Sequence, residues 1–223
     1  MSKKGKFILF WTAVFGITMG YFEASVVIYL RKIVYIEGFS FPLVEPEIDL
    51  IITELGREFM SVCMLVAVGV LAGRSHFERF VLFCFAFGFW DILYYVFLKL
   101  LIGWPESIFT WDILFLIPVP WVGPVWSPVL CAIGFIMAGI LVVKQEETPH
   151  PVRPKISEWI IAIAGGTIVI ISWCEEYRSI MAGESPESFA WPVYWIGFIM
   201  GAAAFGKAYL RSVRRVKDTG FRK

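Results

Sequence analysis

Acidic side chains inside apolar runs are the residues of this sequence best suited to do chemistry. Asp91 stands within the run Phe80–Leu98, which carries no other charge. If this run is an α-helix, its rise per residue puts Asp91 roughly 16 Å from the start of the run, near the middle of a bilayer. Carboxyl groups at such a depth are costly and usually functional. We expect Asp91 to serve as a proton relay, a contact for a cation or a catalytic acid.

Three further charges share one face of another apolar run. Glu54, Arg57 and Glu58 are spaced i, i+3 and i+4, which makes them neighbours on a helix. Glu23 interrupts the run Phe7–Leu30, which is otherwise uncharged. Two interpretations are open. Either Arg57 neutralises the glutamates of its own helix and fixes a neighbouring helix, or these side chains bind a ligand.

Charged residues at the ends of the apolar runs add to this group. Asp112 begins the fourth segment and Arg31 ends the first. Aromatic side chains, which also gather at membrane interfaces, accompany them. Together these positions predict a polar cavity with aromatic walls, open to the outer face of the membrane. The candidate ligand-binding or proton-coupling residues are Glu23, Arg31, Glu54, Arg57, Glu58, Asp91, Tyr94, Trp111, Asp112 and Trp121.

Metal and cofactor chemistry has little support in the sequence. The cysteines, Cys63, Cys84, Cys131 and Cys174, have no CxxC spacing, and the two histidines lie in polar connections. A zinc site needs clustered His or Cys, and a haem site needs buried histidines. We therefore expect no metal and no cofactor, and we expect the cysteines to pack as small apolar residues.

The composition places these residues in a membrane. Of the 223 residues, 58% are hydrophobic and 17% are charged, and the mean hydropathy is +0.72. In soluble domains apolar residues are nearer half and charged residues nearer a quarter. The composition therefore excludes a disordered chain, a nucleic-acid binder and an ordinary soluble enzyme. The partner that we expect is the lipid bilayer.

The apolar runs are long enough for six transmembrane helices, since a bilayer core needs about 20 apolar residues of helix. We therefore predict an all-α fold, a polytopic helical bundle that forms a single domain over residues 1–223. The first run is too long for the apolar part of a signal peptide, so it should remain as a helix. The predicted spans cover residues 7–30, 50–73, 80–102, 111–143, 158–174 and 191–210, and a basic cytoplasmic tail follows at 211–223.

The fourth span is interrupted. Four prolines lie between residues 117 and 128, and proline cannot continue a helix. We expect the main helix at Val129–Val143 and a short outer helix or re-entrant piece at Trp111–Leu116. Two interpretations of residues 117–128 are open: a broken helix that lines a substrate site, or an interfacial loop held by Trp121 and Trp126.

Basic residues predict the orientation. Lys and Arg concentrate in the N-terminal tail, the second and fourth connections and the C-terminal tail. Cytoplasmic segments of membrane proteins carry an excess of these residues. We therefore predict a multi-pass protein of the plasma (inner) membrane with both termini in the cytoplasm.

Small residues and a short repeated motif complete the pattern. Glycines spaced by four residues allow helices to approach closely, within one chain or between two copies. The tetrapeptide Trp-Asp-Ile-Leu occurs at residues 90–93 and again at 111–114, a match too short to establish an internal repeat. The glycine motifs are Gly16-x-x-x-Gly20, Gly197-x-x-x-Gly201 and the pair Gly165-Gly166.

The segments Gly20–Arg31, Glu54–Glu58, Trp90–Tyr95 and Thr110–Trp121 resemble a family of uncharacterised bacterial multi-span integral membrane proteins. The resemblance covers roughly residues 10–140. It implies a bundle of about six helices and no particular activity.

Three functions are compatible with this pattern. The first is a small transporter or a substrate-binding membrane subunit, with a cationic ligand favoured by the excess of carboxylates. The second is a membrane-embedded enzyme that acts on a lipid or an isoprenoid, with one acid as the proton donor. The third is a structural or assembly subunit of a homo-oligomer or a larger membrane complex. Base rates for six-span proteins of this size favour the first.

Overall fold

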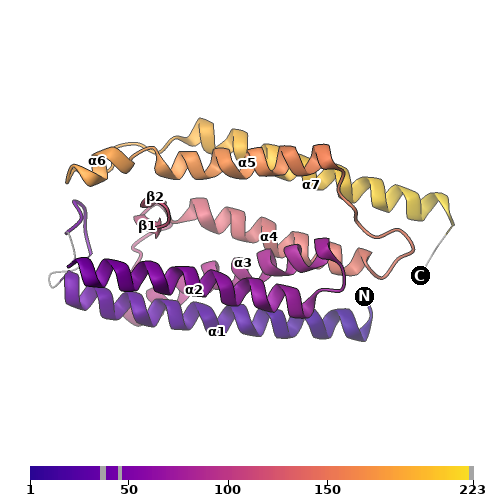
Figure 1. Ribbon diagram of the computed structural model, residues 1–223, viewed down its shortest axis with the longest axis horizontal. Helices are drawn as coiled ribbons and strands as arrows, with labels where there is room; N and C mark the ends of the chain where they lie inside the picture. The colour runs from indigo at the N-terminus through magenta and orange to yellow at the C-terminus, as the bar shows by residue number, and fades with distance from the viewer. Residues whose placement is uncertain (36–38, 45–46, 221–223) are drawn as a thin grey trace.

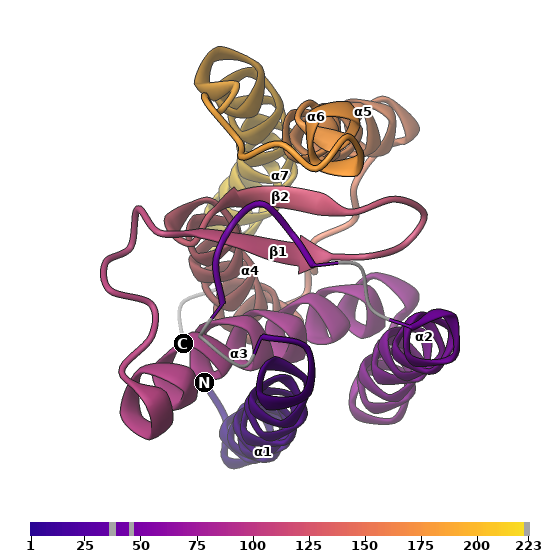
Figure 2. The ribbon, with the colours of Figure 1, turned by 90° about the vertical axis from the view of Figure 1, so that its left-hand side faces the viewer.

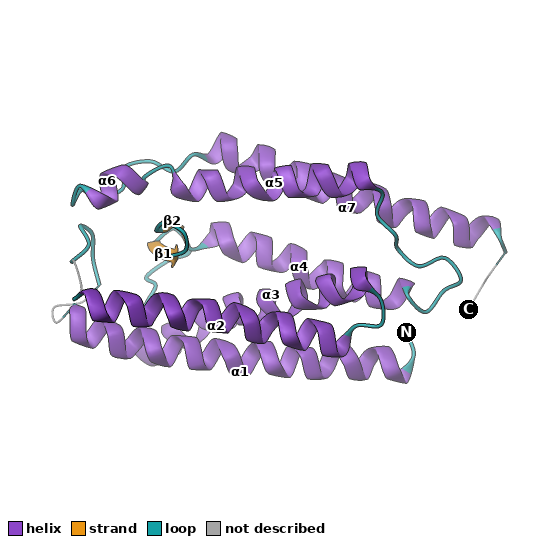
Figure 3. Ribbon diagram, viewed as in Figure 1, coloured by secondary structure: helices purple, strands orange, loops and turns teal. Residues whose placement is uncertain are grey.

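A computed structural model describes residues 1–35, 39–44 and 47–220. Within these residues six helices are long and apolar enough to cross a membrane. The chain is therefore an integral membrane protein, and the predicted all-α bundle is confirmed (Figures 1 and 3). The long helices are α1 (Lys3–Val34), α2 (Ile48–Ala72), α3 (His76–Ile102), α4 (Trp126–Gln145), α5 (Ile156–Cys174) and α7 (Trp191–Asp218), and α6 (Tyr177–Met181) is short.

The helices extend beyond the apolar runs of the sequence. α1 begins at Lys3, with the side chain of Ser2 accepting a hydrogen bond from the Gly5 N–H. α7 continues to Asp218 through most of the segment expected as a tail. Lysine and arginine have high helix propensity, so a helix can continue past the apolar part of the bilayer. The basic residues at 222 and 223 and the acid at 45 lie outside the described residues.

The segment Trp111–Leu116 is not the short helix that the sequence predicts. β1 (Trp111–Phe115) pairs antiparallel with β2 (Trp121–Pro124), with Ile113 opposite Val122. Prolines in the connecting loop prevent helix formation. Figure 1 shows this hairpin recessed inside the ends of α1 and α2. Backbone groups removed from water need hydrogen-bond partners, and the pairing of the two strands supplies them.

α4 begins directly after the hairpin. Its first residue is Trp126, three positions before the predicted start at Val129. Pro128 lies in the first turn, where the N–H groups of a helix have no partner within it, so proline does not interrupt the helix. The predicted break is therefore confined to the hairpin.

At least one glycine of each predicted motif lies where two helices of the chain touch. A Cβ atom added to Gly16 would lie 2.6 Å from the carbonyl oxygen of Ala86, so α1 and α3 touch through their backbones. On α5 and α7, added Cβ atoms at Gly165 and Gly197 would lie 2.7 and 2.5 Å from the other glycine's carbonyl oxygen. The glycine contacts therefore form inside one copy of the protein.

The long helices form two groups, seen along the bundle axis in Figure 2. α3 packs against α1, α2 and α4, whereas α5 packs mainly on α7. The two chain ends lie at one end of the bundle, the terminal end, and the hairpin lies at the other, the hairpin end (Figure 1).

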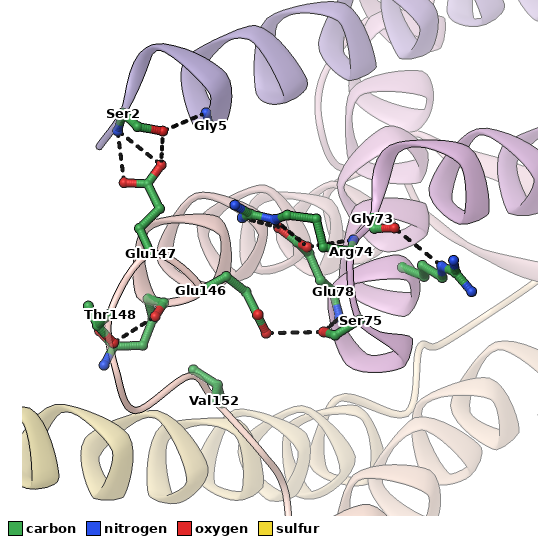
Figure 4. A network of polar contacts seen from close by, with 12 residues as sticks. Ser2, Gly5, Gly73, Arg74, Ser75, Glu78, Glu146, Glu147, Thr148 and Val152 are labelled. Atoms are coloured by element: carbon green, nitrogen blue, oxygen red, sulfur yellow. Dashed lines mark hydrogen bonds and ion pairs between the residues drawn. The ribbon is translucent and has the colours of Figure 1, made fainter.

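Polar contacts join the helices at the terminal end (Figure 4). Glu78 is fully buried and pairs with Arg74 at 2.5 Å. The Ser75 hydroxyl donates to Glu146 at 3.1 Å, linking α3 to α4. The amide of Gln145 donates to the hydroxyl of Ser212 at 2.9 Å, linking α4 to α7. The last of these contacts connects the two helix groups at this end.

Substitution of Gly16 should separate α1 from α3. In Gly16→Ile the side chain has no space beside Ala86, so we expect a loss of about 1–3 kcal/mol of stability. The measurement is thermal unfolding in mild detergent. Gly56→Ile is the matched control, because a Cβ atom there would meet nothing within 4 Å. Equal melting temperatures for the two variants would contradict the packing described.

Candidate functional site

A buried ion pair fixes the hairpin to α1. The Nη2 atom of Arg31 lies 3.1 Å from Oδ1 of Asp112, and the Asp112 side chain is 2% exposed. The hydroxyl of Tyr94 on α3 donates to Oδ2 of the same carboxylate at 3.5 Å. The Arg31 guanidinium also lies over the rings of Phe39 and Trp104, at 4.3 and 3.7 Å from their centres. Asp112 is therefore held from two helices.

Arg57 joins α2 to α1. Its Nε atom donates to Glu54 at 2.8 Å, and its guanidinium also pairs with Glu23 on α1. Glu58, on the same helix face, accepts a hydrogen bond from the Leu116 N–H at 3.0 Å. Arg57 therefore neutralises one glutamate of its own helix and one of its neighbour. Glu58 supplies a second attachment for the hairpin.

Asp112 lies outside the spanning helices. Burial is the main influence on its carboxyl group and raises the pKa to about 6, while Arg31 and hydrogen bonds from the Ile113 N–H and two tyrosines act in the opposite direction. The folded protein therefore binds the Asp112 proton more tightly than the unfolded chain does.

Asp91 has no cationic partner among the described residues. It lies near the middle of α3 and lines the same space as the groups above. Its Oδ2 atom is buried and has no hydrogen-bond partner in the described residues. Four donors share this condition, namely Nη1 of Arg31 and the Nε1 atoms of Trp90, Trp121 and Trp126. A buried polar atom left without a partner costs about 1–3 kcal/mol.

A cleft of about 1510 Å³ connects these groups with the rest of the bundle. It is lined by all six long helices and by the hairpin. Its charged lining residues lie between the middle of the bundle and the hairpin end, apart from Glu158, which pairs with Arg211. Toward the terminal end the walls are mostly apolar. The cleft therefore has one polar half and one apolar half.

The structure brings nearly all of the predicted site residues to this cleft. Of the ten, only Trp111 is absent from the described lining, and its ring packs against Phe189 instead, with centres 6.1 Å apart. The lining also includes Cys131, Gly134 and Phe198, which the sequence did not mark. Apolar residues carry no chemical signal of a site, so only the packing of the helices could reveal them.

Aromatic packing and hydrogen bonds join the hairpin and the start of α4 to α5 and α7 at this end of the cleft. The rings of Trp121 on β2 and Trp173 on α5 stack with centres 5.7 Å apart. The Trp173 Nε1–H donates to the hydroxyl of Ser127 at 2.9 Å, and the hydroxyl of Tyr194 donates to the Ser127 carbonyl at 2.7 Å. These contacts tie α5 and α7 to the start of α4.

Among the described residues, no group of three or more His, Cys, Asp or Glu side chains could hold a metal ion. The arrangement can instead place a polar group among carboxylates, arginines and indoles, with apolar matter beyond it. Comparison with protein-family models found no match, and searches of curated proteins and of solved structures also found none. The resemblance to a bacterial family stays a prediction.

The raised pKa of Asp112 predicts a stability that falls as the pH rises. The stabilisation from its proton should be fully present below about pH 4 and lost as the pH passes about 6. Asp112→Asn should remove this part of the pH dependence. Unfolding measured from pH 4 to pH 8 tests this, with Asp49→Asn, an exposed site, as the control. An unchanged slope in Asp112→Asn would refute the assignment.

Proposed function

We propose that the protein binds an amphiphilic molecule of the bilayer, a lipid or an isoprenoid, in the cleft. Its polar head would lie among the charges of the hairpin end, and its hydrocarbon part would lie in the apolar half between α4, α5 and α7. The division of one continuous cleft into a charged half and an apolar half carries this proposal.

The size and position of the cleft support such a ligand. Pockets for drug-sized molecules occupy about 300–1,000 Å³, and this cleft is larger, at about 1510 Å³. α2 packs on α1 and α3, whereas α5 packs on α7 and β2. α2 and α5 both contribute lining residues, such as Val62 and Trp159, and in this proposal a molecule in the bilayer enters the cleft between them.

The unpartnered atoms indicate the kind of head group. Within the described part of the chain, Nη1 of Arg31 and Nε1 of Trp121 are donors without acceptors, and Oδ2 of Asp91 is an acceptor without a donor. A neutral group such as a hydroxyl both accepts and donates, so it could serve both kinds of atom. A phosphate is disfavoured, because the described lining holds five carboxylates but two arginines in this half.

The position of Asp91 suits an enzyme that acts on this molecule. Its carboxyl group lies where the polar half of the cleft meets the apolar half. It can therefore reach the part of a bound ligand that joins head and chain. A carboxyl group in that position can transfer a proton to or from the ligand, the role of a general acid or base.

Trp121→Phe should weaken ligand binding about 2- to 10-fold, the value of one neutral hydrogen bond. The measurement is the amount of lipid that copurifies in mild detergent, identified by mass spectrometry after solvent extraction. Trp126→Phe is the matched control, since its Nε1 also lacks a partner but the residue does not line the cleft. Bare wild-type protein, or equal loss in both variants, would count against the proposal.

A small transporter or substrate-binding subunit for a cationic solute is the second candidate. The excess of carboxylates over arginines in the polar half favours it. In this case native mass spectrometry would find a small cation in place of a lipid, and radiolabelled choline would be taken up by vesicles that contain the protein. Copurification of another protein chain would instead support an assembly role.

We infer that both termini face the cytoplasm and that the membrane is the plasma (inner) membrane. The basic connections lie at the terminal end, near Arg74 and Lys144, and α7 ends there with Arg211, Arg214 and Arg215 (Figure 1). The excess of Lys and Arg on the cytoplasmic side of membrane proteins supports this orientation.

Fusions to the C-terminus test the orientation. A fluorescent protein at this position should fluoresce, and an alkaline phosphatase that needs export should be inactive. The same fusions placed in the exposed turn after α6, near Gly183, provide the opposite control. Active phosphatase at the C-terminus would reverse the proposed topology.

A further inference from the structure

Three helical glycines among the described residues line the cleft at positions where a side chain would not meet a neighbouring helix. They are Gly134 on α4, Gly166 on α5 and Gly201 on α7. A Cβ atom added to any of them would meet nothing within 4 Å. Gly165, by contrast, packs directly against α7. A glycine inside a helix costs about 0.5–1 kcal/mol relative to alanine, so packing gives no reason for these three.

The three glycines lie at a similar depth. We estimate the depth of each glycine from the number of residues between it and the hairpin end of its helix, multiplied by the rise per residue of an α-helix. This depth is roughly 12 to 15 Å for Gly134, Gly166 and Gly201. Asp91 lies roughly 16 Å inward on α3 by the same count. The missing side chains therefore enlarge the cleft at about the level of Asp91.

Unpartnered polar atoms occur at the same level. Trp90 is 8% exposed and lines the cleft, yet its Nε1 has no partner in the described residues. The Oδ2 atom of the adjacent Asp91 is in the same condition. The ring of Phe87 lies 5.0 Å from that of Trp90 and 6.2 Å from that of Phe135. Near Asp91 the cleft therefore has aromatic walls, polar atoms without hydrogen-bond partners in the described residues, and space left by the missing side chains of the glycines.

We propose that Gly134, Gly166 and Gly201 form a widened part of the cleft that selects a bulky hydrocarbon, methyl-branched or ring-bearing as in isoprenoids, over a straight acyl chain. This inference rests on the proposed function and specifies its ligand class. A straight chain does not need the additional width, whereas methyl branches or fused rings do. The aromatic walls provide contact surface for such a group.

The test uses two alcohols as probes, geranylgeraniol for a branched chain and octadecanol for a straight chain. Their binding to wild type, Gly166→Leu and Gly201→Leu is measured in lipid nanodiscs by displacement and native mass spectrometry. The leucine side chain should fill the widened part. We expect geranylgeraniol binding to fall at least 10-fold in both variants and octadecanol binding to change less than 3-fold.

Gly206→Leu is the matched control on α7. An added Cβ atom at Gly206 also meets nothing within 4 Å, but this residue does not line the cleft. Its binding of both probes should equal that of wild type. If the leucine variants do not fold, the double variant Gly166→Ala and Gly201→Ala replaces them. Its binding of geranylgeraniol should fall about 3-fold, and its binding of octadecanol should not change.

The outcomes separate this inference from the proposed function. Wild-type protein that binds neither alcohol would refute the proposed function and the inference with it. Wild-type protein that binds both, with leucine variants that bind both normally or lose both equally, would overturn the inference alone. A loss in Gly206→Leu equal to that in Gly201→Leu would also overturn it, because the effect would then not come from the cleft.

Discussion

The buried pair of Arg31 and Asp112 is the interaction on which the hairpin end depends. Both partners are nearly inaccessible to solvent, with side-chain exposures of 11% and 2%. Removal of one partner from such a pair typically costs 3–5 kcal/mol, because the other charge stays buried. The pair therefore holds β1 against the end of α1.

The position of the hairpin determines the shape of the cleft. Glu58 on α2 holds the residue after β1, and Trp121 on β2 stacks on Trp173 of α5. The hairpin thus lies between the two helix groups and keeps them apart at this end (Figure 2). At the terminal end the groups meet through direct polar contacts such as Gln145 to Ser212. A cleft with a polar half beneath the hairpin follows from this arrangement.

The pairing of charges leaves Asp91 as the distinctive group. Arg57 is shared by Glu23 and Glu54, and Arg31 serves Asp112. These pairs join helices or anchor the hairpin, so they have structural reasons to exist. The Oδ2 atom of Asp91 has no hydrogen-bond partner in the part of the chain that the structure describes. Asp91 carries the carboxyl group of the cleft whose presence the packing explains least, and the three cleft-lining glycines lie at a similar depth.

The sequence alone determined the membrane location, the six helices and the group of charges, because a bilayer imposes length and hydropathy on each span independently of the others. Tertiary structure decided the rest. The tetrapeptide Trp-Asp-Ile-Leu is helical at residues 90–93 and extended at 111–114. Only the second occurrence is followed closely by prolines and pairs with another strand. The partner of Arg57 on α1 and the glycines of the cleft also depended on helix packing, because contacts between distant segments leave no periodic signal along the chain.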